Sequence, residues 1–107
     1  MNYELVNILG SVKVLERIFG KSLRILVIEL FLCNPDSLFN LSEIARRLGK
    51  NPGSIYRILP YLVEYGIIEE VNVSHSRKAY RLKKDSPIVA ELSNFYKKIS
   101  KLLASSP

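Results

Sequence analysis

Apolar residues recur at spacings of three and four along most of this 107-residue chain, which is the pattern of amphipathic helices. Residues 2–19 form the first predicted helix, with a weak point at Gly10-Ser11 because an interior glycine costs about 1 kcal/mol relative to alanine. The second predicted helix, residues 21–33, is apolar on nearly every side, which predicts that it is buried. Three further helices are predicted at residues 41–48, 52–65 and 86–104.

Polar residues and glycines mark where two of these helices begin and end. Asn40 with Glu43 three positions later forms a capping box, and Asn51 followed by Pro52 is a second typical helix start. Gly49 separates the two helices, which predicts a tight turn between them.

Pro60 departs from the pattern because it falls inside the predicted helix at residues 52–65. Proline has no amide hydrogen to donate to the carbonyl of Tyr56, and an interior proline costs about 3 kcal/mol in an undisturbed helix. We therefore predict a kink or a loosened turn after Leu59, which also affects the direction of Tyr61.

The period changes from helical to alternating after residue 67. Residues 71–73 and 80–83 alternate between apolar and polar, whereas residues 74–78 are all polar. This pattern predicts a β-hairpin at residues 71–84 with a five-residue loop. Residues 38–40 form at most a short extended segment.

These elements predict one small domain that is mainly α-helical with a small β-hairpin (α+β), in the order of a winged helix-turn-helix with helical extensions at both ends. Its parts are an N-terminal helix at residues 1–20, a helix-turn-helix core with a wing at residues 21–84, and a dimerisation helix at residues 86–104.

The positive charge is concentrated in two windows, residues 44–63 and 71–84. These windows hold nine of the 16 basic residues and none of the 10 acidic ones, in a chain of formal net charge +6. If the two windows fold next to each other, one side of the molecule is strongly basic. Basic residues often only solvate a surface, but two acid-free windows favour a polyanionic partner.

Several classes of function lack the residues that they need. A single cysteine cannot form an internal disulfide, and one Cys with one His cannot form an ordinary zinc site, so we expect no metal and no cofactor. We interpret Cys33 as a core residue rather than a redox sensor, and His75 as a solvated loop residue rather than a metal ligand or a pH sensor.

The sequence also lacks the marks of an enzyme or a membrane protein. It contains no glycine-rich phosphate loop, no paired catalytic carboxylates and no set of nucleophile and base, so we expect no enzymatic activity. No apolar stretch approaches the roughly 20 residues that span a bilayer, and no signal peptide opens the chain. We therefore expect a cytoplasmic, nucleoid-associated protein.

Short helix, glycine turn, second helix and basic hairpin is the order of a winged helix-turn-helix. Residues 41–49 (LSEIARRLG), 51–59 (NPGSIYRIL) and 64–68 (EYGII) resemble winged-helix transcriptional regulators, most closely the small ArsR/MarR-type group of archaea and bacteria. The resemblance covers about residues 21–84 and implies sequence-specific binding of double-stranded DNA. Metal-sensing members of that group use clustered cysteines and histidines, which this chain lacks, so the resemblance implies no metal-responsive control.

A helix fits the major groove of DNA, which is about 12 Å wide, and its N-terminal residues come closest to the base edges. We expect residues 52–65 to be the recognition helix, with Arg57 as the candidate for a bidentate contact to guanine. The wing at residues 71–84 is expected to contact the adjacent minor groove or backbone. The predicted DNA-binding residues are Arg46, Arg47, Lys50, Asn51, Gly53, Ser54, Tyr56, Arg57, Tyr61, Arg77 and Lys78.

Structural roles remain open for some of these residues. Tyr56 and Tyr61 can pack between the recognition helix and the wing instead of contacting DNA. Arg46 or Arg47 can pair with a glutamate, at position 43 or 64, instead of with phosphates.

The two terminal helices carry apolar stripes that a minimal winged helix does not use. We expect a homodimer in which these helices pack across a two-fold axis, because an exposed stripe of that size is a liability in a monomer. The alternative is that the first and last helices pack on each other within one chain. The predicted interface residues are Leu5, Ile8, Val12, Leu15, Ile88, Leu92, Phe95, Ile99 and Leu102.

Two other functions remain open. An architectural chromatin protein would bind DNA with little sequence preference, which the positive charge favours. A winged-helix module that binds protein would need an apolar or acidic recognition helix, whereas this one is basic.

Overall fold

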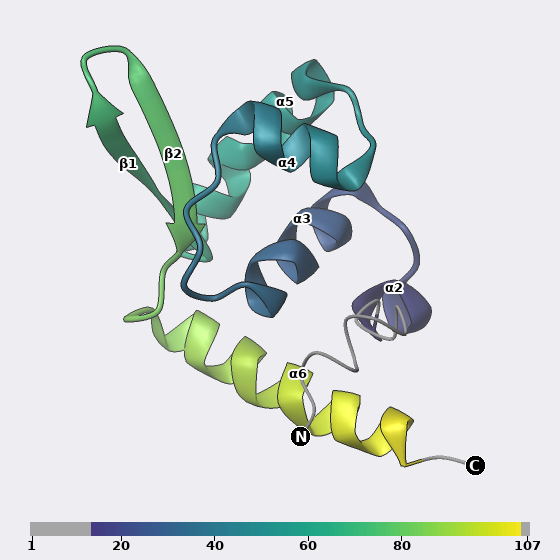
Figure 1. Ribbon diagram of the computed structural model, residues 1–107. Helices are drawn as coiled ribbons and strands as arrows, with labels where there is room; N and C mark the ends of the chain where they lie inside the picture. Colours follow the sequence, from purple (N-terminus) through teal and green to yellow (C-terminus); the bar gives the residue numbers. More distant parts are fainter. Residues whose placement is uncertain (1–13, 106–107) are drawn as a thin grey trace.

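A computed structural model describes residues 14–105 of the chain (Figure 1). Its elements are the helices α2 (Val14–Phe19), α3 (Leu23–Cys33), α4 (Leu41–Leu48) and α5 (Pro52–Glu64), the strands β1 (Ile68–Ser74) and β2 (Arg77–Leu82), and the helix α6 (Pro87–Ala104). Their order confirms the predicted winged helix-turn-helix. The greater part of the helix predicted at residues 2–19, with Gly10-Ser11 and the predicted interface residues Leu5, Ile8 and Val12, lies outside the described residues.

Side chains that cap the helices set where they begin. Asn40 and Glu43 form the predicted capping box at α4, with the Glu43 backbone N–H donating to Asn40 Oδ1 at 2.8 Å. Gly49, at φ 64°, ends α4 in the left-handed region that glycine tolerates. Helix α3 begins two residues later than predicted, because the Ser22 hydroxyl caps it by accepting the N–H of Ile25.

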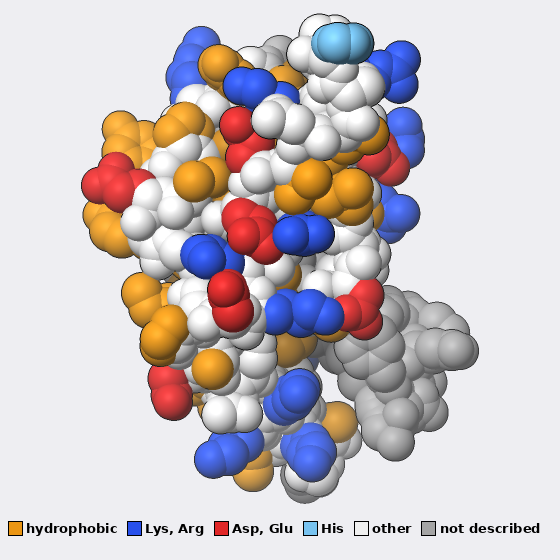
Figure 2. Space-filling model, turned by 90° about the vertical axis from the view of Figure 1, so that its left-hand side faces the viewer, with side chains coloured by type: hydrophobic (Ala, Val, Ile, Leu, Met, Phe, Trp, Pro, Cys, Tyr) orange, Lys and Arg blue, Asp and Glu red, His pale blue; other side chains and the backbone are white. Residues whose placement is uncertain are grey.

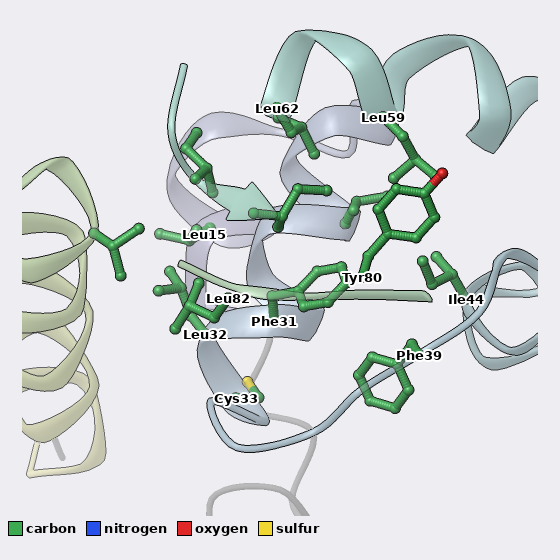
Figure 3. Packing of buried hydrophobic residues seen from close by; sticks show 14 of the residues in the cluster. Leu15, Phe31, Leu32, Cys33, Phe39, Ile44, Leu59, Leu62, Tyr80 and Leu82 are labelled. Carbon is green, nitrogen blue, oxygen red and sulfur yellow. The ribbon is translucent and has the colours of Figure 1, made fainter. Parts of the chain in front are cut away.

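Helices α3, α4 and α5 pack around one hydrophobic core (Figure 3). Phe31, Ile44, Ile55, Leu59 and Leu62 are each at most 2% exposed. Fully burying a side chain of this size is worth about 1.5–3 kcal/mol. Because the inner face of α5 is fixed by three of these residues, its opposite face is held toward solvent.

The hairpin is longer and its turn tighter than predicted. Strand β1 begins at Ile68, and only His75 and Ser76 separate it from β2, so the predicted five-residue loop is wrong. Arg77 and Lys78 belong to β2 and pair with Ser74 and Asn72 across the ladder. Both faces of the hairpin near the turn are exposed, so these strand residues do not need the apolar alternation that sequence patterns detect.

A single bridge connects the hairpin to the segment that leads into α4. The Phe39 N–H donates to the Tyr80 carbonyl at 2.9 Å, and the Tyr80 N–H donates to the Phe39 carbonyl at 2.8 Å. The Phe39 ring also packs edge-on against Phe31 of the core, with ring centres 5.5 Å apart. The extended segment predicted at residues 38–40 is therefore confirmed, and it holds the wing beside the helix-turn-helix.

Helix α5 continues through Pro60 to Glu64 without a break in its assignment. Pro60 lies on the exposed side of the helix, as does Tyr56, whose carbonyl the proline cannot serve. Pro60 therefore does not end the helix. The kink predicted after Leu59 stays a prediction.

The terminal helices use part of their apolar stripes within the chain. Leu15 is 3% exposed and belongs to the core, and Leu92 and Ile99 are half-buried against the same core. The Phe19 and Phe95 rings of α2 and α6 lie 6.4 Å apart, so these helices do pack on each other, as the alternative to dimerisation held. Ile88 and Phe95 remain 49% and 39% exposed, and Leu102 is 63% exposed.

A buried carboxylate ties three helices together. Glu29 of α3, which the sequence pattern placed on an all-apolar helix, is only 4% exposed. Its Oε1 accepts the backbone N–H groups of Leu15 at 3.1 Å and Glu16 at 3.3 Å, and its Oε2 accepts the Tyr96 hydroxyl of α6 at 3.0 Å. The Cys33 thiol lies 2.8 Å from the same hydroxyl. These bonds link α2, α3 and α6.

Burial changes the titration of this network. Burial raises the pKa of Glu29 above its ordinary value, although the hydrogen bonds from Leu15 and Tyr96 act in the opposite direction. Burial likewise raises the pKa of the Cys33 thiol to about 12. Cys33 is 4% exposed, which confirms its interpretation as a core residue.

The raised pKa of Glu29 predicts a pH-dependent stability. A carboxyl group with a higher pKa in the folded chain binds its proton more tightly there, so its contribution is complete below the unfolded pKa of about 4.3 and is lost as pH rises through the folded pKa. We expect Glu29→Gln, which cannot ionise, to gain stability relative to the original chain as pH rises through that window.

Urea unfolding at a series of pH values measures the difference between the two proteins, and Glu91→Gln on exposed α6 surface is the matched control. A difference that stays constant with pH, or that grows in favour of Glu29, would contradict the prediction.

Candidate nucleic-acid interface

The helix-turn-helix and the hairpin turn lie on one side of the molecule, and α6 lies along the opposite side (Figure 1). The first side therefore carries the residues that the sequence assigned to DNA. Whether each of them is exposed and unpaired decides which can bind a duplex.

The N-terminal half of α5 presents a polar face to solvent. Gly53, Tyr56 and Arg57 are exposed, and Ser54 is half-buried. No acidic residue between 14 and 105 forms an ion pair with Arg57. This guanidinium, one turn into the helix, is therefore available to a ligand.

The start of α5 is shaped by its cap. Asn51 Oδ1 accepts the backbone N–H groups of Gly53 at 2.7 Å and Ser54 at 3.3 Å. A Cβ at position 53 would lie 3.0 Å from that same oxygen, so glycine here leaves room for the cap. Gly53 has this structural role in addition to the close backbone approach that the sequence suggested.

The basic residues of α4 and the turn after it are exposed. Arg46, Arg47 and Lys50 form no ion pair with an acidic residue of the described chain, so the pairing considered for the two arginines with Glu43 or Glu64 is wrong. Glu43 is occupied by the capping box. The Arg47 guanidinium lies 4.8 Å from the centre of the Phe39 ring, which orients it along the bridge to the wing.

The two tyrosines of α5 lie on opposite flanks of the helix. The Arg24 guanidinium of α3 lies over the Tyr61 ring, 4.3 Å from its centre, so Tyr61 packs beside α3 rather than beside the wing. Sequence reasoning did not find Arg24, because the contact joins positions 37 residues apart. Tyr56, by contrast, lies close enough to Tyr80 of β2 to contribute to its raised pKa, after burial and Glu70.

Most of the positive charge of the wing is paired, in part because strand β1 extends the hairpin beyond the acid-free residues 71–84 that the sequence indicated. Because β1 begins at Ile68, it brings two glutamates into the ladder, Glu69 opposite Arg81 and Glu70 opposite Tyr80. The pairs are Lys78–Glu70 at 3.6 Å, Arg81–Glu69 at 2.8 Å, Lys83–Asp85 at 3.2 Å and Lys84–Asp36. Figure 2 shows acidic and basic side chains interspersed on the flank of the molecule where the hairpin lies.

Arg77, next to the turn, is the basic residue of the hairpin that forms no ion pair with a described acidic group. Lys78 and Glu70 are both largely exposed, and exposed pairs contribute only about 0.2–1 kcal/mol, so a phosphate can compete for Lys78. The unpaired cations near the helix-turn-helix are thus Arg46, Lys50, Arg57 and Arg77.

Other chemistries find little support in residues 14–105. No three His, Cys, Asp or Glu side chains in this range come together in a way that could hold a metal ion. Within the same range, every helix is too short or too polar to cross a bilayer.

Known proteins share this architecture. The model of the IclR helix-turn-helix domain matches residues 23–71, from the start of α3 into β1. Among curated proteins, none matches the sequence at a significant level.

Three solved structures illustrate the likeness. Lactococcus lactis ZitR, as a C30AH42A mutant in apo form, is 16% identical with a TM-score of 0.59, over 94% of this chain and 76% of its own. Reduced HlyU from Vibrio cholerae is 15% identical with a TM-score of 0.57, over 92% of this chain and 97% of its own. A MarR-family transcriptional regulator from Rhodococcus is 16% identical with a TM-score of 0.57, over 92% of this chain and 71% of its own. At these identities the likeness shows the winged-helix fold.

Proposed function

We propose that this chain is a winged-helix DNA-binding transcriptional regulator that acts as a homodimer on a roughly palindromic site in double-stranded DNA. Such a protein works at the nucleoid in the cytoplasm. The ArsR/MarR-like grouping remains a resemblance, and the fold and domain are those of regulators rather than enzymes.

One observation carries the proposal. Arg46 of α4, Lys50 of the turn after it, Arg57 of α5 and Arg77 of β2 are exposed and form no ion pair with a described acidic residue, whereas the other four basic residues of the wing are paired. Folding therefore leaves unpaired charge on the first turns of α5, on the helix and turn before it, and beside the hairpin turn; the N-terminal part of a recognition helix is where it meets DNA.

Each residue of this surface has a distinct expected partner. Arg57 reads guanine by a bidentate contact, with Ser54 and Tyr56 beside it for bases or phosphates. Arg46, Arg47 and Lys50 contact phosphates. The start of α5, which Asn51 caps, directs the positive end of the helix dipole toward a further phosphate. Arg77, with Lys78 in second place, contacts the neighbouring minor groove or its backbone. Tyr61 is the least supported of the predicted DNA-binding residues, because the Arg24 guanidinium already covers its ring.

The dimer is supported by apolar side chains that stay exposed on α2 and α6. Ile18, Phe19, Ile88 and Phe95 are between 39% and 59% exposed, and Phe19 and Phe95 are in contact with each other. Leu15, Leu92 and Ile99 pack in or against the core of their own chain instead. The proposed interface therefore contains fewer residues than the sequence predicted. Across a two-fold axis, two α5 helices would meet major grooves about 34 Å apart.

Selection of bound sequences from a random duplex pool, at two salt concentrations, tests the proposed function. Recovery of an inverted repeat supports a regulator that reads sequence. Binding without sequence preference and with a steep salt dependence would instead support an architectural role.

The unpaired arginines predict two different mutational effects. We expect Arg57→Ala to lose about 1–3 kcal/mol of discrimination at one base pair of each half-site. Arg77→Ala should weaken binding to all sequences alike and reduce the slope of log K against log salt by about 1. Lys78→Ala should do the same to a smaller extent, because Glu70 already occupies the ammonium group.

Fluorescence anisotropy with the selected site, single-base variants of it and a random duplex separates these effects. Equal losses on specific and random duplexes for Arg57→Ala would contradict its assigned role.

The exposed apolar flank predicts that a charge placed there separates the protomers. We expect Phe95→Asp and Ile88→Asp to yield monomers that stay folded, since both positions are partly exposed, and that bind the selected site at least about tenfold more weakly. Sedimentation equilibrium with circular dichroism checks both points. Ala90→Asp, on an exposed part of α6 away from this flank, is the control, and a Phe95→Asp protein that remains dimeric would refute the interface.

A further inference from the structure

Helix α6 carries a second group of cations on the side of the molecule opposite the helix-turn-helix. Lys97, Lys98 and Lys101 are all exposed, and none of them forms an ion pair with an acidic residue in the described part of the chain. Figure 2 shows basic side chains gathered at the end of the molecule where α6 lies. The one acidic residue of α6, Glu91, lies more than a turn before them.

Helical geometry places these lysines on a face of their own. At about 100° per residue, they centre about 140° around the helix from Val89 and Tyr96, the side chains that α6 buries. They centre about 120° from the exposed apolar flank of Ile88 and Phe95. The lysines therefore face away from the core and, in the proposed dimer, away from the partner.

A duplex held by α5 and the wing cannot reach this face, because the whole core lies between the two sides (Figure 1). We propose that Lys97, Lys98 and Lys101 form a second, sequence-independent DNA-binding surface, through which the protein bridges its specific site to another duplex. Bridging rests on the proposed function, because it requires a specific site bound by α5 and the wing. Binding of a duplex to the α6 lysines does not require that function.

The chemistry of the face fits a DNA backbone. Lys97 and Lys101 are separated by about 6 Å along the helix axis, a spacing over which a DNA strand presents about two phosphates. Lysine acts as a flexible point charge and reads no base pattern, so this surface contributes affinity and salt dependence without specificity. A dimer presents two such faces.

A bridging assay tests the inference with the intact protein. A biotinylated duplex carrying the selected site is fixed to beads and saturated with protein, and capture of a fluorescent random duplex is measured at about 50 mM salt. We expect the original protein to capture the second duplex. A variant with Lys97→Gln, Lys98→Gln and Lys101→Gln should capture at least about fivefold less, while its affinity for the selected site changes less than about twofold.

The control removes unpaired, exposed basic charge elsewhere, with Arg17→Gln and Lys21→Gln, and should capture the second duplex normally. Loss of capture by the α6 variant also excludes bridging by two recognition helices on different duplexes, since that variant keeps those helices. Equal capture by the α6 variant and the original protein, or no capture by the original protein, would overturn the proposal.

A second arm does not depend on the proposed function. In a protein with Arg57→Ala and Arg77→Ala, the residual binding of a random duplex should weaken further when the three α6 lysines are also replaced, and its salt slope should fall again, because fewer phosphates are then neutralised. Residual binding whose affinity and salt slope do not change on that replacement would overturn the inference. So would lysine-dependent binding to phosphatidylserine vesicles together with none to the duplex, which would identify a membrane surface as the occupant.

Discussion

The two backbone hydrogen bonds between Phe39 and Tyr80 fix the geometry on which the whole surface depends. They attach the hairpin to the residue that precedes the capping box of α4, and the Phe39 ring is itself held by Phe31 in the core. Wing and helix-turn-helix are therefore parts of one rigid unit. Ile68 and Leu82, which pair across the base of the hairpin, are also buried in the same core, so the bridge and this packing together fix the position of Arg77 relative to Arg57.

Within that frame, the distribution of ion pairs decides which charges can act. The wing supplies its own counter-charges through Glu69 and Glu70, which leaves Arg77 as its available cation. The basic residues of the helix-turn-helix and of α6 form no ion pair with an acidic residue of the described chain. Net charge alone would predict that the wing makes the strongest contact with DNA. The ion pairs of the wing instead indicate that the start of α5 makes it.

Local signals in the sequence were sufficient for the order of elements and for the helix starts, because capping is decided by residues three positions apart, as with Asn40 and Glu43. They were insufficient wherever the outcome depends on distant partners. Glu29 is buried because Tyr96 and the N–H of Leu15 meet it, and Arg24 meets Tyr61 only after α3 and α5 pack. The register that places Glu69 opposite Arg81 is likewise set by the hairpin as a whole.

Cleavage of DNA by a tethered iron chelate tests most directly whether wing and recognition helix form one surface. The chelate is attached at Ser76→Cys beside Arg77, in a Cys33→Ser background that removes the one native thiol. Wing and α5 acting together predict cleavage confined to the minor groove next to the bases that Arg57 reads, once in each half-site. Cleavage spread evenly along the duplex, or absent from a complex that still protects those bases, would contradict a joint surface.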